Sequence, residues 1–259
     1  MNLLSIDWDY FFADRTGYDD DMFLYDWGHR ESKLFIEMLW EIRAAGFMRN
    51  KLPLPGTTGD ELRFWPKIRC VPDAPLYIGE SHMFAVDTAI YEPMLLDQRQ
   101  PMIWSFDAHH DLGYSADAVA DIMKGNVDCG SWLLWYGMHL LTDIHICYPT
   151  WHTKWADLDT MHIKPGSINL LPFHFDRQMV TPRLFRSLPV FDAIFVCRSG
   201  AWVPSWLDGQ FFEFINAAPT TNVQRLGDDQ YPLELRPFDL DAAAAHASLV
   251  TSEAVKPTT

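Results

Sequence analysis

Short apolar runs alternate along the chain with longer segments in which apolar residues recur at helical spacing. Strands are predicted where a brief apolar run is rich in β-branched and aromatic residues, at residues 3–6, 76–78, 102–106, 144–148, 168–171 and 193–197. Helices are predicted at about residues 32–45, 83–96, 116–123, 131–141 and 204–217, with a further start at Thr181-Pro182. This alternation predicts an α/β fold, with a single domain of three layers in which helices cover both faces of a mainly parallel sheet. We expect the domain to occupy residues 1–251 and a polar flexible tail to follow at 252–259.

The ends of the helices carry signals of their own. In the first helix, Leu39 and Ile42 belong to one apolar face, and Gly46 is expected to end the helix. Pro93 is expected to interrupt the second helix, because proline lacks an amide hydrogen. Ser131 is expected to cap the helix that begins beside it.

Composition and charge narrow the range of functions. The 259 residues are 48% hydrophobic, which allows one large core, and the formal net charge is −15. An acidic chain without a basic stripe argues against a nucleic-acid partner, and no apolar run is long enough to span a membrane. The start of the sequence lacks the features of a signal peptide, and the four cysteines are far apart, so we expect a cytoplasmic protein with free thiols. The acidity is explained equally by solubility or by attraction of a cationic substrate.

Three polar clusters follow predicted strands directly, and they suggest a metal site. Parallel strands present their carboxyl ends at one edge of a sheet, where sites usually lie. Carboxylate oxygens together with imidazole nitrogen suit a divalent ion such as Mn²⁺. Taken singly, an Asp-x-Asp pair, a lone histidine or a polar turn is also common without a metal. The candidate ligands are Asp7, Asp9, His82, Asp107, His109 and Asp111.

The segment Asp107-Ala108-His109-His110-Asp111 resembles the central metal motif of the arginase (ureohydrolase) superfamily. The resemblance implies an arginase/deacetylase-like fold with two manganese ions, held by four aspartates and two histidines. In that superfamily the Asp-x-Asp pair normally follows a late strand, whereas here the late segment Cys197-Arg198-Ser199 has no carboxylate. The pair stands instead at Asp7 and Asp9, which implies a rearranged or circularly permuted version of the fold.

A narrower resemblance is to the peptide arginases, which convert arginine side chains of ribosomally made precursor peptides to ornithine. It rests on several short motifs between about residues 3 and 208: Asp-Trp-Asp-Tyr-Phe-Phe, Tyr-Asp-Trp-Gly-His-Arg-Glu, Glu-Ser-His, Asp-Ala-His-His-Asp-Leu and Trp-Val-Pro-Ser-Trp-Leu-Asp. By this resemblance Glu31 and Asp128 are the candidates for pairing with the guanidinium group, and Asn126 is a candidate substrate contact. His29 and Asp128 are the candidate catalytic residues, with His29 as the group that moves protons. A position at the N-terminus of a helix explains the presence of His29 and Glu31 equally well, since an acidic residue is favourable at that end of a helix.

The chemistry of the guanidinium group agrees with such a site. This planar cation is a poor electrophile, so its hydrolysis needs a strong nucleophile, which a pair of metal ions supplies from water. By the resemblance, the expected partner is an arginine-containing precursor peptide. Four tryptophans in polar loops would line a groove for the peptide or simply pack together: Trp8, Trp27, Trp202 and Trp206. Alternatives are a small-molecule ureohydrolase acting on free arginine or agmatine, a metal-dependent deacetylase of the same fold, and a non-catalytic metal-binding partner protein. The sequence leaves open whether the protein forms a homo-oligomer.

Overall fold

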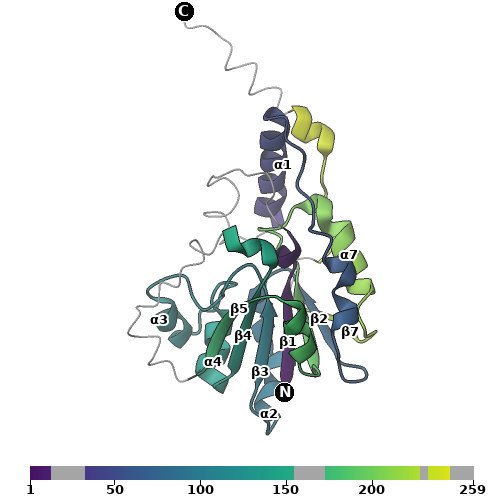
Figure 1. Ribbon diagram of the computed structural model, residues 1–259. Coiled ribbons are helices and arrows are strands. Elements are labelled where there is room, and N and C mark those ends of the chain that lie inside the picture. The colour runs from purple at the N-terminus through teal and green to yellow at the C-terminus, as the bar shows by residue number, and fades with distance from the viewer. Residues whose placement is uncertain (13–32, 155–172, 228–232, 246–259) are drawn as a thin grey trace, which may run out of the picture.

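A seven-stranded parallel sheet is the centre of the protein. The computed structural model describes residues 1–12, 33–154, 173–227 and 233–245 (Figure 1). The strands lie in the order β5-β4-β3-β1-β6-β2-β7 and all pair in parallel. Their bounds are β1 Asn2–Asp7, β2 Leu76–Gly79, β3 Met102–Phe106, β4 Asp143–Tyr148, β5 Phe175–Met179, β6 Ala193–Cys197 and β7 Val223–Arg225.

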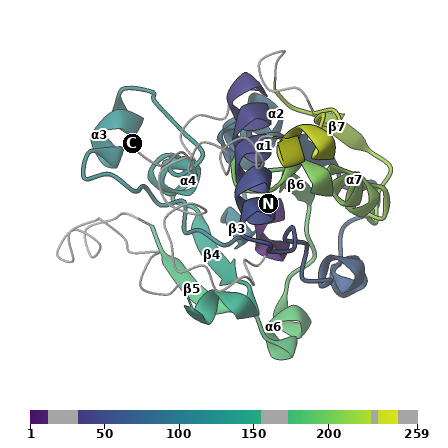
Figure 2. The ribbon, with the colours of Figure 1, turned by 90° about the horizontal axis from the view of Figure 1, so that it is seen from above.

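Helices cover both faces of the sheet, which confirms the predicted three-layer α/β architecture (Figure 2). One face is covered by α2 (Thr88–Leu96), α3 (Ala118–Met123) and α4 (Trp132–Leu140), and the other by α6 (Pro182–Ser187) and α7 (Asp208–Asn216). Successive residues of a strand point to opposite faces, so Leu3 belongs to the first core and Leu4 to the second. The helix α1 (Lys33–Arg49) stands above the carboxyl edge of the sheet, where Trp40 packs in a third, smaller cluster (Figure 1).

Most predicted elements are present, but the first helix differs from its prediction. It continues past Gly46 to Arg49, because the carbonyl oxygen of Gly46 still accepts a helical hydrogen bond from the amide of Asn50, and the chain turns only at Lys51 with φ 57°. Ile42 is 56% exposed, so its assignment to the buried face is wrong. The buried side chains on this helix include Leu39 and Trp40.

Proline does not break the second helix where the sequence suggests it would. A 3₁₀ turn, η4 (His82–Val86), comes first, and α2 then runs through Pro93. Pro93 cannot donate to the carbonyl oxygen of Ala89, but the hydroxyl of Tyr77 donates to that oxygen at 3.0 Å. The side chain of Asp87 caps the new start by accepting from the amide of Ala89 at 2.9 Å.

Two edge strands have no apolar signature and were not predicted. The strand β5 has the sequence FDRQM, and all three residues of β7 are exposed. The strand predicted at 168–171 and the tail at 252–259 lie outside the described residues. Thr181 caps α6 as predicted, since its hydroxyl accepts from the amide of Leu184 at 3.2 Å. Within the described part of the chain, no helix is long and apolar enough to cross a membrane.

Candidate metal centre

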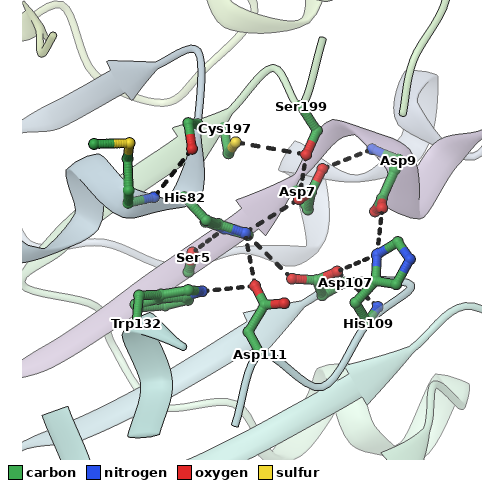
Figure 3. A network of polar contacts seen from close by, with 12 residues as sticks. Ser5, Asp7, Asp9, His82, Asp107, His109, Asp111, Trp132, Cys197 and Ser199 are labelled. Carbon is green, nitrogen blue, oxygen red and sulfur yellow. Dashed lines mark hydrogen bonds and ion pairs between the residues drawn. The ribbon is translucent and has the colours of Figure 1, made fainter. Parts of the chain in front are cut away.

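Six predicted side chains lie together at the carboxyl edge of the sheet (Figure 3). They come from three strands: Asp7 ends β1, His82 follows β2, and Asp107 follows β3. The sheet order places β6 between β1 and β2, so His82 reaches Asp7 above the end of β6. The full set is Asp7, Asp9, His82, Asp107, His109 and Asp111.

The turn after β3 brings three of these side chains back toward one point. The strand ends at Phe106, and the amide of His109 donates to Oδ1 of Asp107 at 2.8 Å, which closes a tight turn. Asp111 has φ 46°, a left-handed conformation that is uncommon for a residue with a side chain. Because of this reversal, the carboxylate of Asp111 faces His82 (Figure 3).

The imidazole of His82 occupies the centre of one half of the cluster. Its Nδ1 atom lies 3.1 Å from Oδ2 of Asp7, 3.1 Å from Oδ2 of Asp111 and 3.4 Å from Oδ2 of Asp107. Its Nε2 atom lies 3.1 Å from the hydroxyl of Ser5, which can hold the ring in the tautomer that leaves Nδ1 as a ligand. One proton on Nδ1 cannot satisfy three carboxylates, whereas a divalent ion can contact all of them.

The second half of the cluster is built around His109. Its Nδ1 atom lies 2.8 Å from Oδ2 of Asp9 and 3.7 Å from Oδ1 of Asp107. Oδ2 of Asp9 and Oδ2 of Asp107 are buried and face imidazole nitrogens, and they accept no other hydrogen bond from the described residues. Buried carboxylate oxygens are costly unless they are hydrogen-bonded, paired with a charge or bound to a metal. The donor set therefore fits divalent cations, and Asp107 belongs to both halves.

Neighbouring donors hold the carboxylates in place. The hydroxyl of Ser199 donates to Oδ2 of Asp7 at 2.7 Å, and Nε1 of Trp132 donates to Oδ2 of Asp111 at 2.7 Å. The ring of Trp132 also stacks on His82, with centroids 4.8 Å apart. Such outer contacts orient metal ligands and tune their basicity.

Burial and mutual repulsion shift the protonation of the carboxylates. Burial, followed by the charges of Asp111 and Asp7, holds the pKa of Asp107 well above its usual range. Burial and the charge of Asp7 raise the pKa of Asp9 to about 6. Burial opposes ionisation of Asp7 as well, but the charge of His82 and hydrogen bonds lower its pKa. The six groups thus have the strong negative potential that a cation would relieve.

The two imidazoles respond in the opposite direction. Burial disfavours the charged form of His82, but the charges of Asp7 and its neighbours raise its pKa well above the usual value. Burial also disfavours the charged form of His109, but the charges of Asp9 and Asp107 raise its pKa well above the usual value. In the absence of a cation, protons on the two rings therefore balance part of the carboxylate charge.

A sulfur atom adds a ligand that the sequence did not suggest. The thiol of Cys197, at the end of β6, lies close enough to Asp7 and His82 to complete a third group of possible ligands. All four cysteines are free as predicted, but Cys70 and Cys129 are only half-buried. Hard oxygen donors outnumber this one soft donor, so the set as a whole suits a hard or borderline ion.

Of the four predicted substrate-binding and catalytic residues, two lie among the described residues and two do not. His29 and Glu31 lie outside the described residues. Asn126 and Asp128 line a cavity of about 370 Å³ ahead of α4. Asp128 accepts a hydrogen bond from the hydroxyl of Ser131 at 2.6 Å, so Ser131 bonds this turn instead of capping the helix through its side chain. Within the described part of the chain, no hydrogen bond or ion pair joins Asn126 or Asp128 to the six clustered side chains.

The four tryptophans predicted for a peptide groove lie in different surroundings. Trp27 lies outside the described residues, and Trp206 is half-buried, with its Nε1 atom donating to the carbonyl oxygen of Pro55 at 2.9 Å. Trp8 is fully buried in the core, so it cannot contact a substrate. Trp202 is half-buried, and its ring lies 4.8 Å from that of His109. Of the three described tryptophans, Trp202 is therefore the one beside the candidate metal centre.

A buried network of charges supports the loops that carry the site. Arg198 donates through Nε to Oε2 of Glu80 at 2.6 Å and through Nη1 to Oδ2 of Asp208 at 3.0 Å. Arg236 donates to both oxygens of Asp208 and, at 2.7 Å, to the carbonyl oxygen of Gly200. Glu80 precedes the loop of His82, and Arg198 precedes Ser199. This network was not predicted from the sequence, because its members are far apart in the chain and no local pattern links them.

These observations define a buried centre whose carboxylate and imidazole side chains could hold metal ions. Its position at the carboxyl edge of a parallel sheet is where such folds usually place their sites. Comparison of the chain with models of protein families, with curated proteins and with solved structures finds no match.

Proposed function

We propose that the protein is a binuclear manganese hydrolase that converts arginine side chains of a peptide to ornithine and releases urea. The observation that carries the metal part is the arrangement around His82, where one nitrogen faces three carboxylate oxygens. A second ion beside it is supported by the buried Oδ2 atoms of Asp9 and Asp107, which face imidazole nitrogens and accept no other hydrogen bond from the described residues. The choice of the guanidino group rests on the motif resemblance to the peptide arginases.

In this proposal the residues divide between two adjoining sites. His82 and Asp111 would hold one ion, Asp9 and His109 would hold the other, and Asp107 belongs to both groups. When bound, two divalent ions lower the pKa of a water molecule and so provide a hydroxide nucleophile at neutral pH. Ser199 and Trp132 would keep the carboxylates of Asp7 and Asp111 in position throughout the reaction.

The substrate side of the proposal uses carboxylates that are not among the ligands. A guanidinium plane is held best by a carboxylate that accepts two parallel hydrogen bonds. Glu31 and Asp128 are the candidates for that role, and Asn126 lines the same cavity as Asp128. The ring of Trp202 would line the entrance to the active site beside His109.

The proposed reaction is a hydrolysis that consumes one water molecule. Its oxygen becomes the carbonyl oxygen of urea, the bond between the guanidino carbon and the side-chain nitrogen breaks, and that nitrogen leaves as the amine of ornithine. The leaving nitrogen must receive a proton, and His29 is the candidate that delivers it, with Asp128 as the second candidate.

A urea assay with metal-loaded protein tests this function. Urea should be released from an arginine-containing peptide in the presence of Mn²⁺, and faster than from free arginine, because remote contacts position the reacting group. Either Glu31→Gln or Asp128→Asn should lower catalytic efficiency at least ~10-fold with unchanged metal content, since a charge-assisted bond is lost. Asp117→Asn is the matched control, because Asp117 is an exposed carboxylate outside the cavity.

The outcome separates the alternatives. Equal or better turnover of free arginine or agmatine would replace the peptide by a small-molecule substrate. Acetate release from acetylated amines without urea would identify a deacetylase. Tight metal binding with no turnover of any of these substrates would leave a metal-binding partner protein.

A further inference from the structure

A second concave site lies outside the metal centre. It is a groove of about 780 Å³ on the face of the sheet that carries α6, bordered by the 3₁₀ turns η1 (Trp8–Phe11) and η3 (Trp65–Lys67). Figure 2 shows α6 on the side of the sheet away from α2 and α4. The volume lies within the range that small ligands or a few peptide residues fill.

The lining of the groove combines an aromatic base with a basic rim. Phe64 is buried beneath it, and Phe185 is half-buried with the ammonium group of Lys67 4.5 Å from its ring centre. Lys67, Arg69 and Arg186 are exposed around the opening. The lining holds one carboxylate, Asp60, against these three cations, in a chain whose formal net charge is −15. A local positive region in an acidic protein favours a ligand with negative charge.

Tyr10 adds a polar group to the aromatic base. Its side chain is only 6% exposed and lines the groove, and its ring is fixed against Phe11 and Phe106. A phenol hydroxyl that lines a groove can donate a hydrogen bond to a ligand that brings an acceptor.

We propose that this groove binds an acidic and apolar segment of the peptide substrate, remote from the reacting arginine. A carboxylate of that segment accepts a hydrogen bond from Tyr10 and pairs with the cations of the rim, while an apolar side chain packs on Phe64 and Phe185. The identity of the ligand as part of the substrate rests on the proposed function. The same peptide then matches the protein twice, with its cationic side chain at the carboxylate cluster and its acidic segment at the basic groove.

The position of Tyr10 connects the groove with the metal centre. Tyr10 is the neighbour of Asp9 in η1, and its carbonyl oxygen accepts from Nε1 of Trp151 at 3.0 Å. A peptide held at Tyr10 is thus anchored one residue from a candidate metal ligand. Binding free energy from such a remote segment can position the reacting side chain.

A binding experiment on the metal-free full-length chain tests the groove without relying on catalysis. The probe is a fluorescently labelled peptide, Glu-Leu-Phe-Glu-Leu, and its uncharged counterpart is Gln-Leu-Phe-Gln-Leu. The protein variants are the pair Lys67→Glu with Arg186→Glu, and Tyr10→Phe, which removes only the hydroxyl. Arg63→Glu and Arg183→Glu together are the matched control, because both arginines are exposed near the groove but do not line it.

The expected result is selective binding of the acidic probe. Fluorescence anisotropy should show at least ~10-fold weaker binding in the charge-reversed pair and about 5-fold weaker binding in Tyr10→Phe, as loss of charge-assisted and neutral hydrogen bonds predicts. The control pair should stay within about 2-fold, as screened surface charges do. Equal binding of both probes, equal loss in the control, or no binding by the unmodified protein would overturn the proposal.

Activity measurements separate this proposal from the proposed function. If the unmodified protein binds the acidic probe but never releases urea, the proposed function fails and the groove remains a binding site for acidic peptides. If urea is released, the charge-reversed pair should raise KM for an arginine peptide that carries the acidic segment and leave kcat unchanged. An unchanged KM for that peptide would overturn the role of the groove in substrate binding.

Discussion

At the scale of single residues, electrostatic repulsion governs the behaviour of the site. The side chains of Asp7, Asp9, Asp107 and Asp111 share a space that is almost closed to solvent. Four carboxylates in such a space cannot all stay ionised on their own. Either some of them take up a proton, or a cation lies between them. The same arrangement that could hold a metal ion therefore destabilises the fold when no ion is bound.

The variant Asp107→Asn separates these two effects. Because Asp107 is common to both halves of the cluster, the substitution should abolish most binding of Mn²⁺ as measured by calorimetry. It should also raise the melting temperature of the metal-free protein, since a buried repulsive carboxylate is removed, and cancel the rise that Mn²⁺ gives the unmodified protein. Normal metal content in the variant would contradict the assignment of this ligand.

The affinity for metal should depend on pH. A side chain must lose its proton before it can bind a metal. At His82 and His109, the neighbouring carboxylates raise the pKa although burial opposes this. At Asp9, burial raises the pKa to about 6. Protons therefore compete with the ion at low pH, and each displaced proton weakens binding by about 10-fold per pH unit below its pKa. Titrations from pH 8 to pH 5 should show a steadily rising Kd for Mn²⁺. A constant Kd over that interval would count against imidazole and carboxylate ligands.

The ligands could be predicted from the sequence, but their supports could not. Asp107, His109 and Asp111 follow one strand within a few residues, so a local pattern and a general rule for parallel sheets reveal them. Ser199 and Trp132 bond to Asp7 and Asp111 from distant parts of the chain. Serine and tryptophan are common residues, and nothing near them in the sequence marks this role.

At the scale of elements, the turn after β6 is the tightest part of the site's support. A Cβ atom at Gly200 would lie 1.9 Å from Oε1 of Glu80 and 2.6 Å from Nη1 of Arg236. Both neighbours are buried and hydrogen-bonded, so neither can move aside freely. The glycine is required here by space, because the buried charges occupy the position of a side chain.

The variant Gly200→Ala should therefore destabilise the fold. We expect a loss of about 1–3 kcal/mol in the free energy of unfolding, as for other overpacked sites, together with weaker Mn²⁺ binding because Ser199 moves. Chemical denaturation followed by circular dichroism measures the first effect. Gly209→Ala, at an exposed position of α7 with no atom within 4 Å of the new Cβ, should be neutral or stabilising. Equal stability of the two variants would show that the network tolerates the added methyl group.

Elements with an apolar signature were predicted and polar ones were not. The buried strands β1, β3 and β6 are apolar runs, because helices cover both of their faces. The edge strands β5 and β7 need no such pattern, since pairing with one neighbour holds them. The passage of α2 through Pro93 depends on Tyr77, and no rule about helices alone could supply that distant hydroxyl.

At the scale of the whole molecule, the network of Glu80, Arg198, Asp208 and Arg236 joins the end of β2, the end of β6, α7 and the C-terminal segment. All four side chains are buried. Removal of one partner leaves an uncompensated charge in a dry interior, which is more costly than the loss of an exposed ion pair.

Arg236→Met should reduce the free energy of unfolding by roughly 3–5 kcal/mol, because Asp208 loses its bidentate partner. Arg99→Met is the control, since Arg99 pairs with Asp97 and Asp192 at a 59% exposed position, and its loss should cost about 0–1 kcal/mol. Both values come from urea denaturation under identical conditions. Similar losses in the two variants would mean that the buried network contributes no more than a surface pair.

The strand order has a consequence for how the protein is made. All six candidate ligands occur within the first 111 residues of the chain, but β6, which lies between β1 and β2, comes only at Ala193–Cys197. During synthesis from the N-terminus, His82 cannot take its final place beside Asp7 until β6 has emerged and entered the sheet. The nascent chain would therefore carry all six candidate carboxylate and imidazole ligands for a long interval without the geometry to select an ion. For a metal bound at this candidate centre, selection would be a late event of biosynthesis, governed by the ions available when the last central strand is in place.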